Sequence, residues 1–587
     1  MRNANIIRGS VFLDSNGNGM RDNSEEGLKD IYVGLYRGHT EYHNGPVSIT
    51  RKHLVYSTKT DRSGNFIFYA DPRFEYWLSI EDYKFPEGFD AVFIDKRVDL
   101  KSRSSIELAV TKSMPVNEKN INSTSDLCSY GKITSARSEG IIDETEHIKN
   151  LLYSLFDKRK LQQRFLSNVP IKSGTGAYEE IRRYIEKDDA DKGVVNMARQ
   201  YTLSAIPKLD RVYKSPSGYF NIHYTTTGKH SVPSGFRNST PFYILKAGEA
   251  LDNVKALTCG TRGFKEPRLK KDANTYDIYV YDLDGIYGVT FAKSISNKNA
   301  AGTRTASGHI CIDNNYSSKK GFDKSWDECL RVTCAHEFFH AVQNAYNVDA
   351  DIWWKEASAT WNEDEIYKGV NDYVRYIGSY FSSPQKSLDE SNYSGVVFAK
   401  FLSENHGGYD IIKRIWNVQE FNNNSVTSID LALKEGPDKK GIGPAFLKFT
   451  SFNFNPSQYY SEGSSWKSSV KMQNTYTNYP VTSTSGNLSH LSSCYQLFKT
   501  NKEIGGKKLR IMVDTKSRSG INFKLQLRKK KESICESVDI SSNSQSGRAD
   551  ILIDDFKENF DELCLIPANI DKTRDGLDYK FAAGFTE

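Results

Sequence analysis

The stretch from Trp326 to Val348, WDECLRVTCAHEFFHAVQNAYNV, contains two histidines four positions apart, His336 and His340, within the sequence HEFFH. Apolar residues recur at helical spacing and predict one continuous amphipathic helix: Leu330, Cys334, Phe338, Val342 and Ala345. Because side chains four residues apart share one face of a helix, both imidazoles can point at a single metal ion. The stretch therefore predicts a metal-binding helix.

Two glutamates add the groups that metal-dependent hydrolysis requires. Glu337, next to His336, is placed to hold and deprotonate a water on the metal. Glu356, within WWKEASATW (353–361), offers a third ligand from a second helix. Two histidines and one carboxylate with an open fourth position form a catalytic zinc site, whereas a structural site fills all four positions. The alternative is two helices whose exposed His and Glu side chains bind no metal.

Length and composition are those of a multidomain globular protein. A chain of 587 residues should form several domains, and 38% hydrophobic with 26% charged residues argues against disorder. No apolar run reaches the ~20 residues of a membrane helix. The net charge of +6 shows no basic cluster that would indicate a nucleic-acid partner. The amino terminus lacks an apolar signal core, which leaves a removed export signal or a cytosolic protein as alternatives.

The eight cysteines include no C-x-x-C pair, which argues against a cysteine-ligated zinc site. Their even number permits disulfides, for instance among Cys494, Cys535 and Cys564, without demonstrating them. Cys334, on the metal helix, is expected to be a core residue rather than a ligand.

Residues 1–112 are expected to form a β-sandwich, because short β-rich runs alternate with turn residues. Near the start, oxygen-bearing side chains fall at positions 1, 3, 5, 9 and 12 of a loop with glycine at position 6, which is the template of a calcium loop. The candidate ligands are Asp14, Asn16, Asn18, Asp22, Glu25 and the main-chain carbonyl of Met20. A polar turn without a metal is the alternative. With calcium bound, the loop would rigidify the module rather than switch it.

Three segments of this region carry a resemblance: Gly9–Asp14 with the loop that follows, Gly27–Leu28, and Thr60–Phe66. They make the first hundred or so residues similar to the Sdr-type B repeat of bacterial surface proteins. Such repeats are prealbumin-like, calcium-binding sandwiches that act as spacers or adhesive stalks outside the cell. The resemblance implies an extracellular or cell-surface protein, with Asp61 as a further calcium ligand.

The rest of the chain is expected to contain a helical segment, an α+β domain and a second β-sandwich. Residues 113–206 read as a linker and helices that either pack on the enzyme or form a removable pro-segment. Residues 207–478 mix strands and helices. Within them, the strand at 308–313 precedes the metal helix and is expected at the sheet edge, where it would pair with an extended substrate. β-rich runs return over 479–587.

A second resemblance covers the chain from about residue 126 onward. It is carried by residues 217–228, by 276–279 with 287–288, and by 333–340 with Gln343. These segments resemble the family of secreted metalloproteases first described in myxobacteria. The two metal helices also look like those of gluzincins, especially the types of aminopeptidase N and leukotriene hydrolase. The resemblance implies a zincin-like catalytic domain over 207–478.

Two further residues are candidates for roles beside the metal. Gluzincins often use a Tyr or His from a downstream helix to stabilise the oxyanion. Residues 392–398 resemble the Tyr-x-x-Gly segment of the aminopeptidase-like members, which implies Tyr393 in this role. Glu363, two turns after Glu356, is expected to orient a ligating histidine from behind. For both residues, a purely structural role is the alternative.

These patterns predict a secreted or cell-surface zinc endopeptidase in which Glu337 is the general base. The segment 305–309 holds no acid that would bind a substrate α-amine, which disfavours an aminopeptidase. The rival prediction is a calcium-stabilised surface adhesin with an inactive protease domain, but Glu337 has little use there. A cytosolic aminopeptidase fits the missing signal but not the B repeat. Expected partners are protein or peptide substrates, including host or cell-surface proteins, and no nucleic acid.

Overall fold

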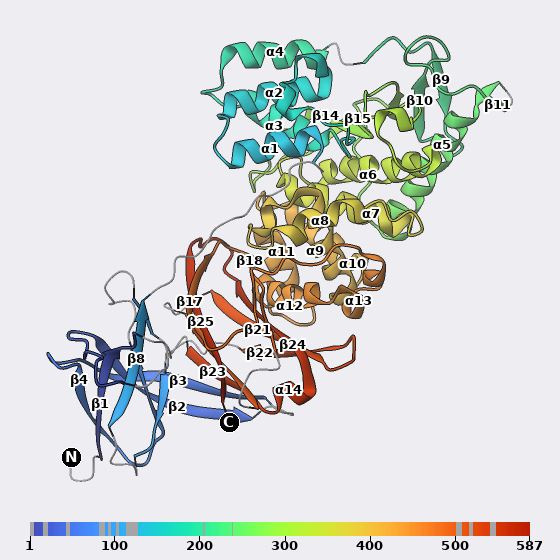
Figure 1. Cartoon of the computed structure of the whole chain (residues 1–587). Helices are drawn as coiled ribbons and strands as arrows, with labels where there is room; N and C mark the ends of the chain where they lie inside the picture. The colour runs from blue at the N-terminus through green and yellow to red at the C-terminus, as the bar shows by residue number, and fades with distance from the viewer. Residues whose placement is uncertain are drawn as a thin grey trace. The chain divides into compact units, whose positions relative to one another are not determined.

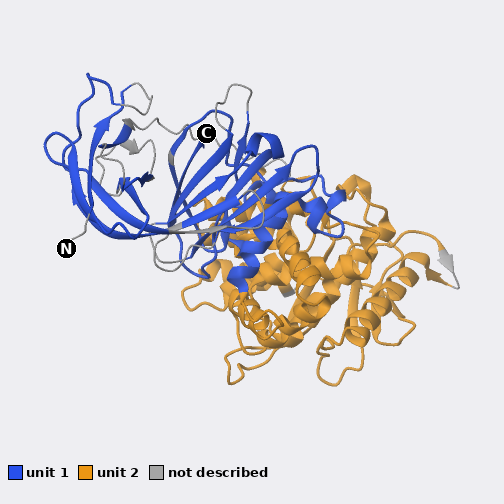
Figure 2. Ribbon diagram, turned by 90° about the horizontal axis from the view of Figure 1, so that it is seen from below, with its two compact units in different colours: residues 1–119, 381–388, 442–587 blue, residues 120–380, 389–441 orange. Residues whose placement is uncertain are grey.

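The computed structural model describes most of the chain. The described residues are 5–15, 21–42, 47–80, 89–91, 95–100, 105–112, 127–203, 206–237, 239–500, 507–515, 520–540 and 548–586. They form two compact units: unit 1 comprises residues 1–119, 381–388 and 442–587, and unit 2 comprises residues 120–380 and 389–441 (Figure 2). Several β-sheets and 14 α-helices among the described residues confirm a multidomain protein of mixed α and β structure.

A five-stranded sheet organises unit 2, with the strand order β14-β15-β13-β10-β9. Its strands are β9 (Arg211–Lys214), β10 (Phe220–Tyr224), β13 (Tyr276–Val280), β14 (Gly288–Ile295) and β15 (Ala306–Ile312). Strands β10, β13 and β15 run parallel, whereas β9 and β14 are antiparallel to their neighbours. A short separate pair, β11 (Phe236–Arg237) and β12 (Thr240–Pro241), completes the strands of the unit.

The prediction that residues 308–313 form an edge strand is wrong. Strand β15 pairs with β13 on one side and with β14 on the other, so both of its edges are used. Strand β14 precedes β15 in the chain, returns antiparallel to it, and pairs Gly288 with Ile312 and Thr290 with Ile310. The sheet edge next to the metal helix is therefore β14.

The predicted metal helix is α6 (Trp326–Tyr346), which begins with a capping box between Ser325 and Glu328. It is continuous, as expected, but it is not amphipathic, because almost all of its residues are buried. The sheet, α5 (Phe242–Lys255) and α7 (Ile352–Ile366) all pack against it. Its polar residues are thus enclosed in the unit, where polar groups require partners.

Helices α1 to α4 pack beside β14 and β15 (Figure 1). Their bounds are α1 (Ser129–Ser138), α2 (Glu144–Phe156), α3 (Thr175–Ile185) and α4 (Lys192–Leu203). Leu151 of α2 and Ile181 of α3 share a core with Val289 and Phe291 of β14. From residue 127 onward, the helical segment packs on the α+β part of the unit.

The remaining helices follow α7 in the chain. They are α8 (Val374–Ser382), α9 (Val396–Asn405), α10 (Tyr409–Gln419), α11 (Ser425–Lys434), α12 (Ile442–Phe454), α13 (Pro456–Tyr459) and α14 (Phe556–Asn559). Helices α12 to α14 belong to unit 1. Across the described ranges, no helix combines the length and the apolar character needed to cross a membrane.

Unit 1 is built from three sheets, with the orders β4-β1-β8-β6, β16-β19-β24-β21-β22 with β18 beside β24, and β17-β25-β20-β23-β3-β2-β5-β7. The amino-terminal strands are β1 (Asn5–Leu13), β2 (Tyr32–Tyr42), β3 (Val47–Lys59), β4 (Asn65–Ala70), β5 (Tyr76–Ile80), β6 (Phe89–Ala91), β7 (Asp95–Val98) and β8 (Ile106–Lys112). The carboxy-terminal strands are β16 (Asn474–Tyr476), β17 (Val481–Leu488), β18 (Ser492–Ser493), β19 (Gln496–Lys499), β20 (Lys508–Thr515), β21 (Ile521–Lys529), β22 (Cys535–Ile540), β23 (Arg548–Ile553), β24 (Phe560–Asn569) and β25 (Leu577–Thr586).

The two β-rich regions of the sequence share one sheet in unit 1. Strand β3 pairs with β2 along one edge and with β23 along the other, with Lys52 opposite Arg548. Lys52 Nζ lies 3.2 Å from a carboxylate oxygen of Asp550, and Arg548 Nε lies 2.9 Å from one of Asp514. The sequence predicts two separate sandwiches, but it contains no local signal for pairing between strands so far apart in the chain.

Candidate metal centre

Three predicted ligands converge at the packed helices α6 and α7. The Nε2 atoms of His336 and His340 are 3.0 Å apart, and Glu356 oxygens lie 3.1 Å and 3.5 Å from them. Ligands at about 2.0–2.1 Å from a tetrahedral zinc ion are separated from one another by roughly 3.3 Å. All three residues are fully buried. This buried group could hold a metal ion, and no second group of three such side chains occurs in the described part of the chain.

Hydrogen bonds between side chains and backbone lock the two helices together. Asn362 of α7 donates to the carbonyl of Ala335, directly before His336. Gln343 of α6 donates in return to the carbonyl of Lys355, directly before Glu356. His336 and Glu356 are thus each adjacent to an anchor from the other helix, which fixes the spacing between this imidazole and the carboxylate.

The orientation of both imidazole rings is set by acceptors behind them. His336 Nδ1 lies 2.6 Å from Glu363 Oε1, and His340 Nδ1 lies 2.8 Å from Gln343 Oε1. Because carboxylate and amide oxygens accept, each Nδ1 carries a hydrogen, which leaves Nε2 as the atom of each ring that faces the candidate metal group. The amide of Gln343 also donates to Ser358, which turns its oxygen toward His340. Glu363 lies where the sequence predicts an orienting carboxylate.

Protons and a metal ion compete for this group. Burial lowers the pKa of His336, but the carboxylates of Glu356 and Glu363 outweigh it and raise that pKa to about 10. Burial raises the pKa of Glu356, but His340 and His336 hold it at about 2. A metal ion bound here would take the place of the proton that the negative surroundings retain on His336.

Glu337 points toward the sheet and is held by two threonines. Its Oε2 accepts hydrogen bonds from Thr175 Oγ1 at 2.9 Å and from Thr290 Oγ1 at 2.7 Å. Its Oε1 is buried without a hydrogen-bond partner. One oxygen of the candidate base is therefore fixed by α3 and β14, while the other is available to a reactant.

Tyr393 also lies beside the metal group, in a turn directly before α9. Its ring centroid is 6.3 Å from that of His336. Its hydroxyl donates to the carbonyl of Ser173 at 2.6 Å and accepts from the amide of Ser173 at 3.2 Å. Burial and the nearby Glu356 carboxylate raise the pKa of Tyr393 well above its usual value, so the hydroxyl keeps its proton and can donate.

A buried lysine that sequence analysis did not identify extends the network. Lys172 Nζ lies 2.7 Å from Glu363 Oε2 and 2.5 Å from Asp372 Oδ2, and it is 1% exposed. It also faces the rings of Tyr287 at 4.8 Å and Tyr376 at 5.9 Å. Burial lowers the pKa of Lys172, but the two carboxylates overcome this and raise it. Its charge is therefore retained.

The predicted calcium loop lies only partly within the described residues. Asn16, Asn18 and Met20 fall outside them. The described ligand candidates Asp14 and Glu25 are buried, whereas Asp22 is exposed. Glu25 accepts from the amides of Ser15 at 2.8 Å and Asp22 at 3.0 Å, which closes the ends of the loop on one carboxylate.

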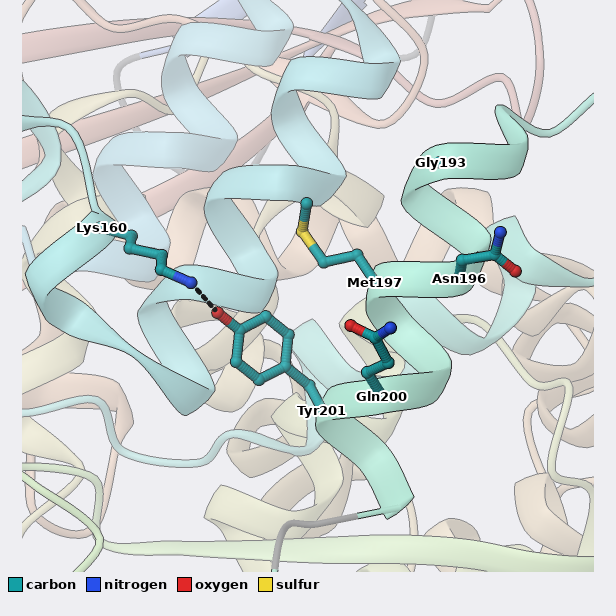
Figure 3. A pocket seen from close by; sticks show the side chains of 6 residues that line it. All are labelled: Lys160, Gly193, Asn196, Met197, Gln200 and Tyr201. Carbon is teal, nitrogen blue, oxygen red and sulfur yellow. Dashed lines mark hydrogen bonds between the residues drawn. The ribbon is translucent and has the colours of Figure 1, made fainter.

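A surface hollow of about 520 Å³ lies on α4 (Figure 3). It is lined by Lys160, Gly193, Asn196, Met197, Gln200 and Tyr201. Lys160 Nζ donates to the hydroxyl of Tyr201 at 3.1 Å across one end of it. None of these residues takes part in the metal centre.

No protein-family model matches the chain. No curated protein matches it. Among solved structures, one match is a family GH115 4-O-methyl-α-glucuronidase with specificity for decorated arabinogalactans. That match has a TM-score of 0.13 and 7% identity and covers 55% of this chain and 53% of the other, which is too weak to inform fold or function.

Proposed function

We propose that the chain is a zinc-dependent hydrolase that cleaves peptide bonds within proteins. The observation that carries the proposal is the buried group of His336, His340 and Glu356, with both Nδ1 atoms paired and both Nε2 atoms directed at one point. Nitrogen and carboxylate ligands at this spacing suit zinc. A ligand set of three leaves a fourth position for water or substrate.

Zinc at this group would lower the pKa of a water ligand and polarise a substrate carbonyl. Glu337 is the proposed general base: its free Oε1 accepts the proton of the attacking water, and the same carboxyl then protonates the leaving amine. Thr175 and Thr290 hold the other oxygen, so the carboxylate keeps one orientation through both transfers. Tyr393 is the proposed donor to the oxyanion, a role for which its hydroxyl must leave Ser173.

The test separates metal binding from base catalysis. Wild type and Glu337→Gln should each bind one equivalent of zinc, because Glu337 is not in the ligand group, whereas His340→Ala should lose it. Only the wild type should cleave a fluorescently labelled unfolded protein. Because the ligands are fully buried, that cleavage should be slow and is followed over hours.

Glu249→Gln is the matched control, since Glu249 is an exposed glutamate on α5 of the same unit. It should bind zinc and cleave like the wild type. Equal cleavage by wild type and Glu337→Gln would refute the assignment of the base. Failure of His340→Ala to lose zinc would refute the metal centre itself.

The amino-terminal part of unit 1 extends the proposal to location and calcium. The B-repeat resemblance and the placement of Asp14 and Glu25 at the closed ends of the loop support a calcium-stabilised module on a secreted or cell-surface enzyme. On this view, the module holds the catalytic unit near protein substrates outside the cell.

A further inference from the structure

The metal centre has no exposed ligand, and one short segment accounts for much of its closure. His336, His340, Glu356 and Glu337 are each 0% exposed. A peptide bond cannot reach a metal that is enclosed in this way. If the chain is a peptidase, as proposed, whatever closes the centre must therefore move.

Residues 171–178, termed the cover segment, comprise the non-helical residues 171–174 and the first turn of α3 (175–178), and they lie along the free edge of β14 and of the residues directly before it. Ile171 donates to Gly285 and accepts from Tyr287, and Gly174 donates to the carbonyl of Gly288. These bonds are 2.8–3.0 Å long, and the bridge between Ile171 and Ile286 is parallel. Backbone pairing of this kind is how an extended peptide binds to a sheet edge.

Further along β14, side chains of the cover segment continue the contact. Thr175 Oγ1 accepts from the amide of Thr290 at 2.8 Å, and the hydroxyl of Tyr178 donates to the carbonyl of Ala292 at 3.0 Å. Backbone N–H and C=O groups on the free edge of β14 are thus hydrogen-bonded to the cover segment.

The same segment contacts the candidate catalytic groups. Thr175 binds the carboxylate of Glu337, and the backbone of Ser173 binds the hydroxyl of Tyr393. Gly176 packs so tightly that a Cβ atom there would lie 3.1 Å from Glu356 Oε1. The backbone and hydroxyls of the cover segment therefore use the positions that a substrate peptide would need.

Lys172 fills a pocket built for a cation. Two carboxylates, Glu363 and Asp372, lie within 2.7 Å of its Nζ, and the rings of Tyr287 and Tyr376 face it. All four residues lie outside the cover segment: Glu363 is on α7, Tyr376 is on α8, Asp372 is in the turn before α8, and Tyr287 directly precedes β14. If the cover segment left, the pocket would keep two buried negative charges and two aromatic faces, which suit a lysine or arginine side chain.

We propose that the cover segment is an exchangeable substrate mimic: an extended peptide with a basic side chain in the Lys172 pocket displaces it and reaches the metal centre. This inference rests on the proposed peptidase function and assigns to it a substrate class and a closed resting state. The residues that select the substrate are Glu363 and Asp372.

The test weakens the cover segment at two residues, Gly174 and Tyr178, whose own contacts with β14 do not involve Glu337 or Tyr393. Gly174→Ala puts a methyl group 2.5 Å from Val289 Cγ2, so the segment or Val289 must shift, which weakens the packing of the segment on β14. Tyr178→Phe removes only the bond to Ala292 and keeps the shape of the ring. Gly131→Ala on α1, where a Cβ meets only ordinary contacts, and Tyr153→Phe on α2 are the matched controls.

The probe is a fluorescent synthetic peptide with the sequence of the cover segment, IKSGTGAY, whose binding is measured by anisotropy on the zinc-loaded full chain. Binding should strengthen about fivefold in Tyr178→Phe and about tenfold or more in Gly174→Ala, and the controls should match the wild type. A peptide carrying Lys172→Met should bind about 30-fold more weakly, because two buried carboxylates lose their partner.

Each result decides a separate statement. Equal peptide binding by wild type and both weakened variants would overturn the exchange, and equal binding of the Met peptide would overturn the basic pocket. If Gly174→Ala does not fold, Tyr178→Phe still tests the exchange. Cleavage of an unfolded protein is measured on the same samples. Stronger peptide binding without cleavage in either variant would sink the peptidase proposal while leaving the exchange intact.

Discussion

The carboxylate behind His336 allows a sharp test of how the centre holds its metal. Glu363 accepts from His336 Nδ1 at 2.6 Å and also pairs with Lys172 at 2.7 Å. Glu363→Gln keeps the shape of the side chain but removes its charge. Loss of such a partner typically lowers metal affinity by about 10–100-fold, which corresponds to about 1.4–2.7 kcal/mol. The expected result is a zinc Kd raised by that factor in a competition titration with a chromogenic chelator.

Asp372→Asn is the control for this experiment. Asp372 shares Lys172 with Glu363 and lies 2.5 Å from its Nζ, but among the described residues it makes no hydrogen bond to either histidine ligand. Both variants remove one negative charge from the same buried lysine, so they perturb the charge balance alike. Only Glu363→Gln changes the acceptor of His336. If both variants weakened zinc binding to the same extent, Glu363 would act through the lysine rather than through His336, and the reasoning would be refuted.

Four other changes have defined outcomes. Gln343→Leu removes the acceptor of His340 and should raise the zinc Kd about tenfold in the same titration. Calcium should raise the melting temperature of the wild type but not of Asp14→Asn, as followed by calorimetry. Burial lowers the pKa of His309 to about 3 in the folded state, whereas its pKa in the unfolded state is about 6.5. As the pH falls below 6.5, the unfolded state takes up a proton that the folded state does not, so His309 lowers the unfolding free energy. In denaturant titrations from pH 6 to pH 4, His309→Gln should reduce the fall in unfolding free energy by up to about 1.4 kcal/mol per pH unit. Arg548→Met leaves the carboxylate of Asp514 without its buried arginine and should lower the unfolding free energy of unit 1 by about 3–5 kcal/mol.

The convergence of the ligands could be predicted because it depends on short-range geometry. His336 and His340 share one face of a single helix, and residues 347–351 are too few to let α7 leave its neighbour. Glu356 and Glu363 lie two turns apart on α7, so a sequence that places one beside the metal also places the other near it. Both relations can be predicted from the helical period and from the short connection between α6 and α7.

The partners of Glu337 and Glu363 could not be predicted, because they come from distant elements and from common residue types. Thr175 and Thr290 reach Glu337 from α3 and β14, and no spacing in the sequence relates them to the metal helix. Lys172 reaches Glu363 across a large part of the chain in the same way. The edge position of β14 was missed for a related reason, since strand order depends on long-range pairing that local patterns do not encode.

On the proposed mechanism, closure and selectivity both depend on the positive charge that occupies the Lys172 pocket. Glu363 and Asp372 are 2% and 1% exposed, and burying carboxylates without a cation is costly. The cover segment meets this need with Lys172, so its departure alone would leave two buried negative charges beside the metal group. A neutral peptide cannot restore the balance and would compete poorly with the chain's own segment. A basic peptide restores it fully, because it returns a positive charge to the same pocket as it takes the edge of β14. On the proposed mechanism, the interaction that keeps the centre closed is therefore the one that selects which substrate opens it.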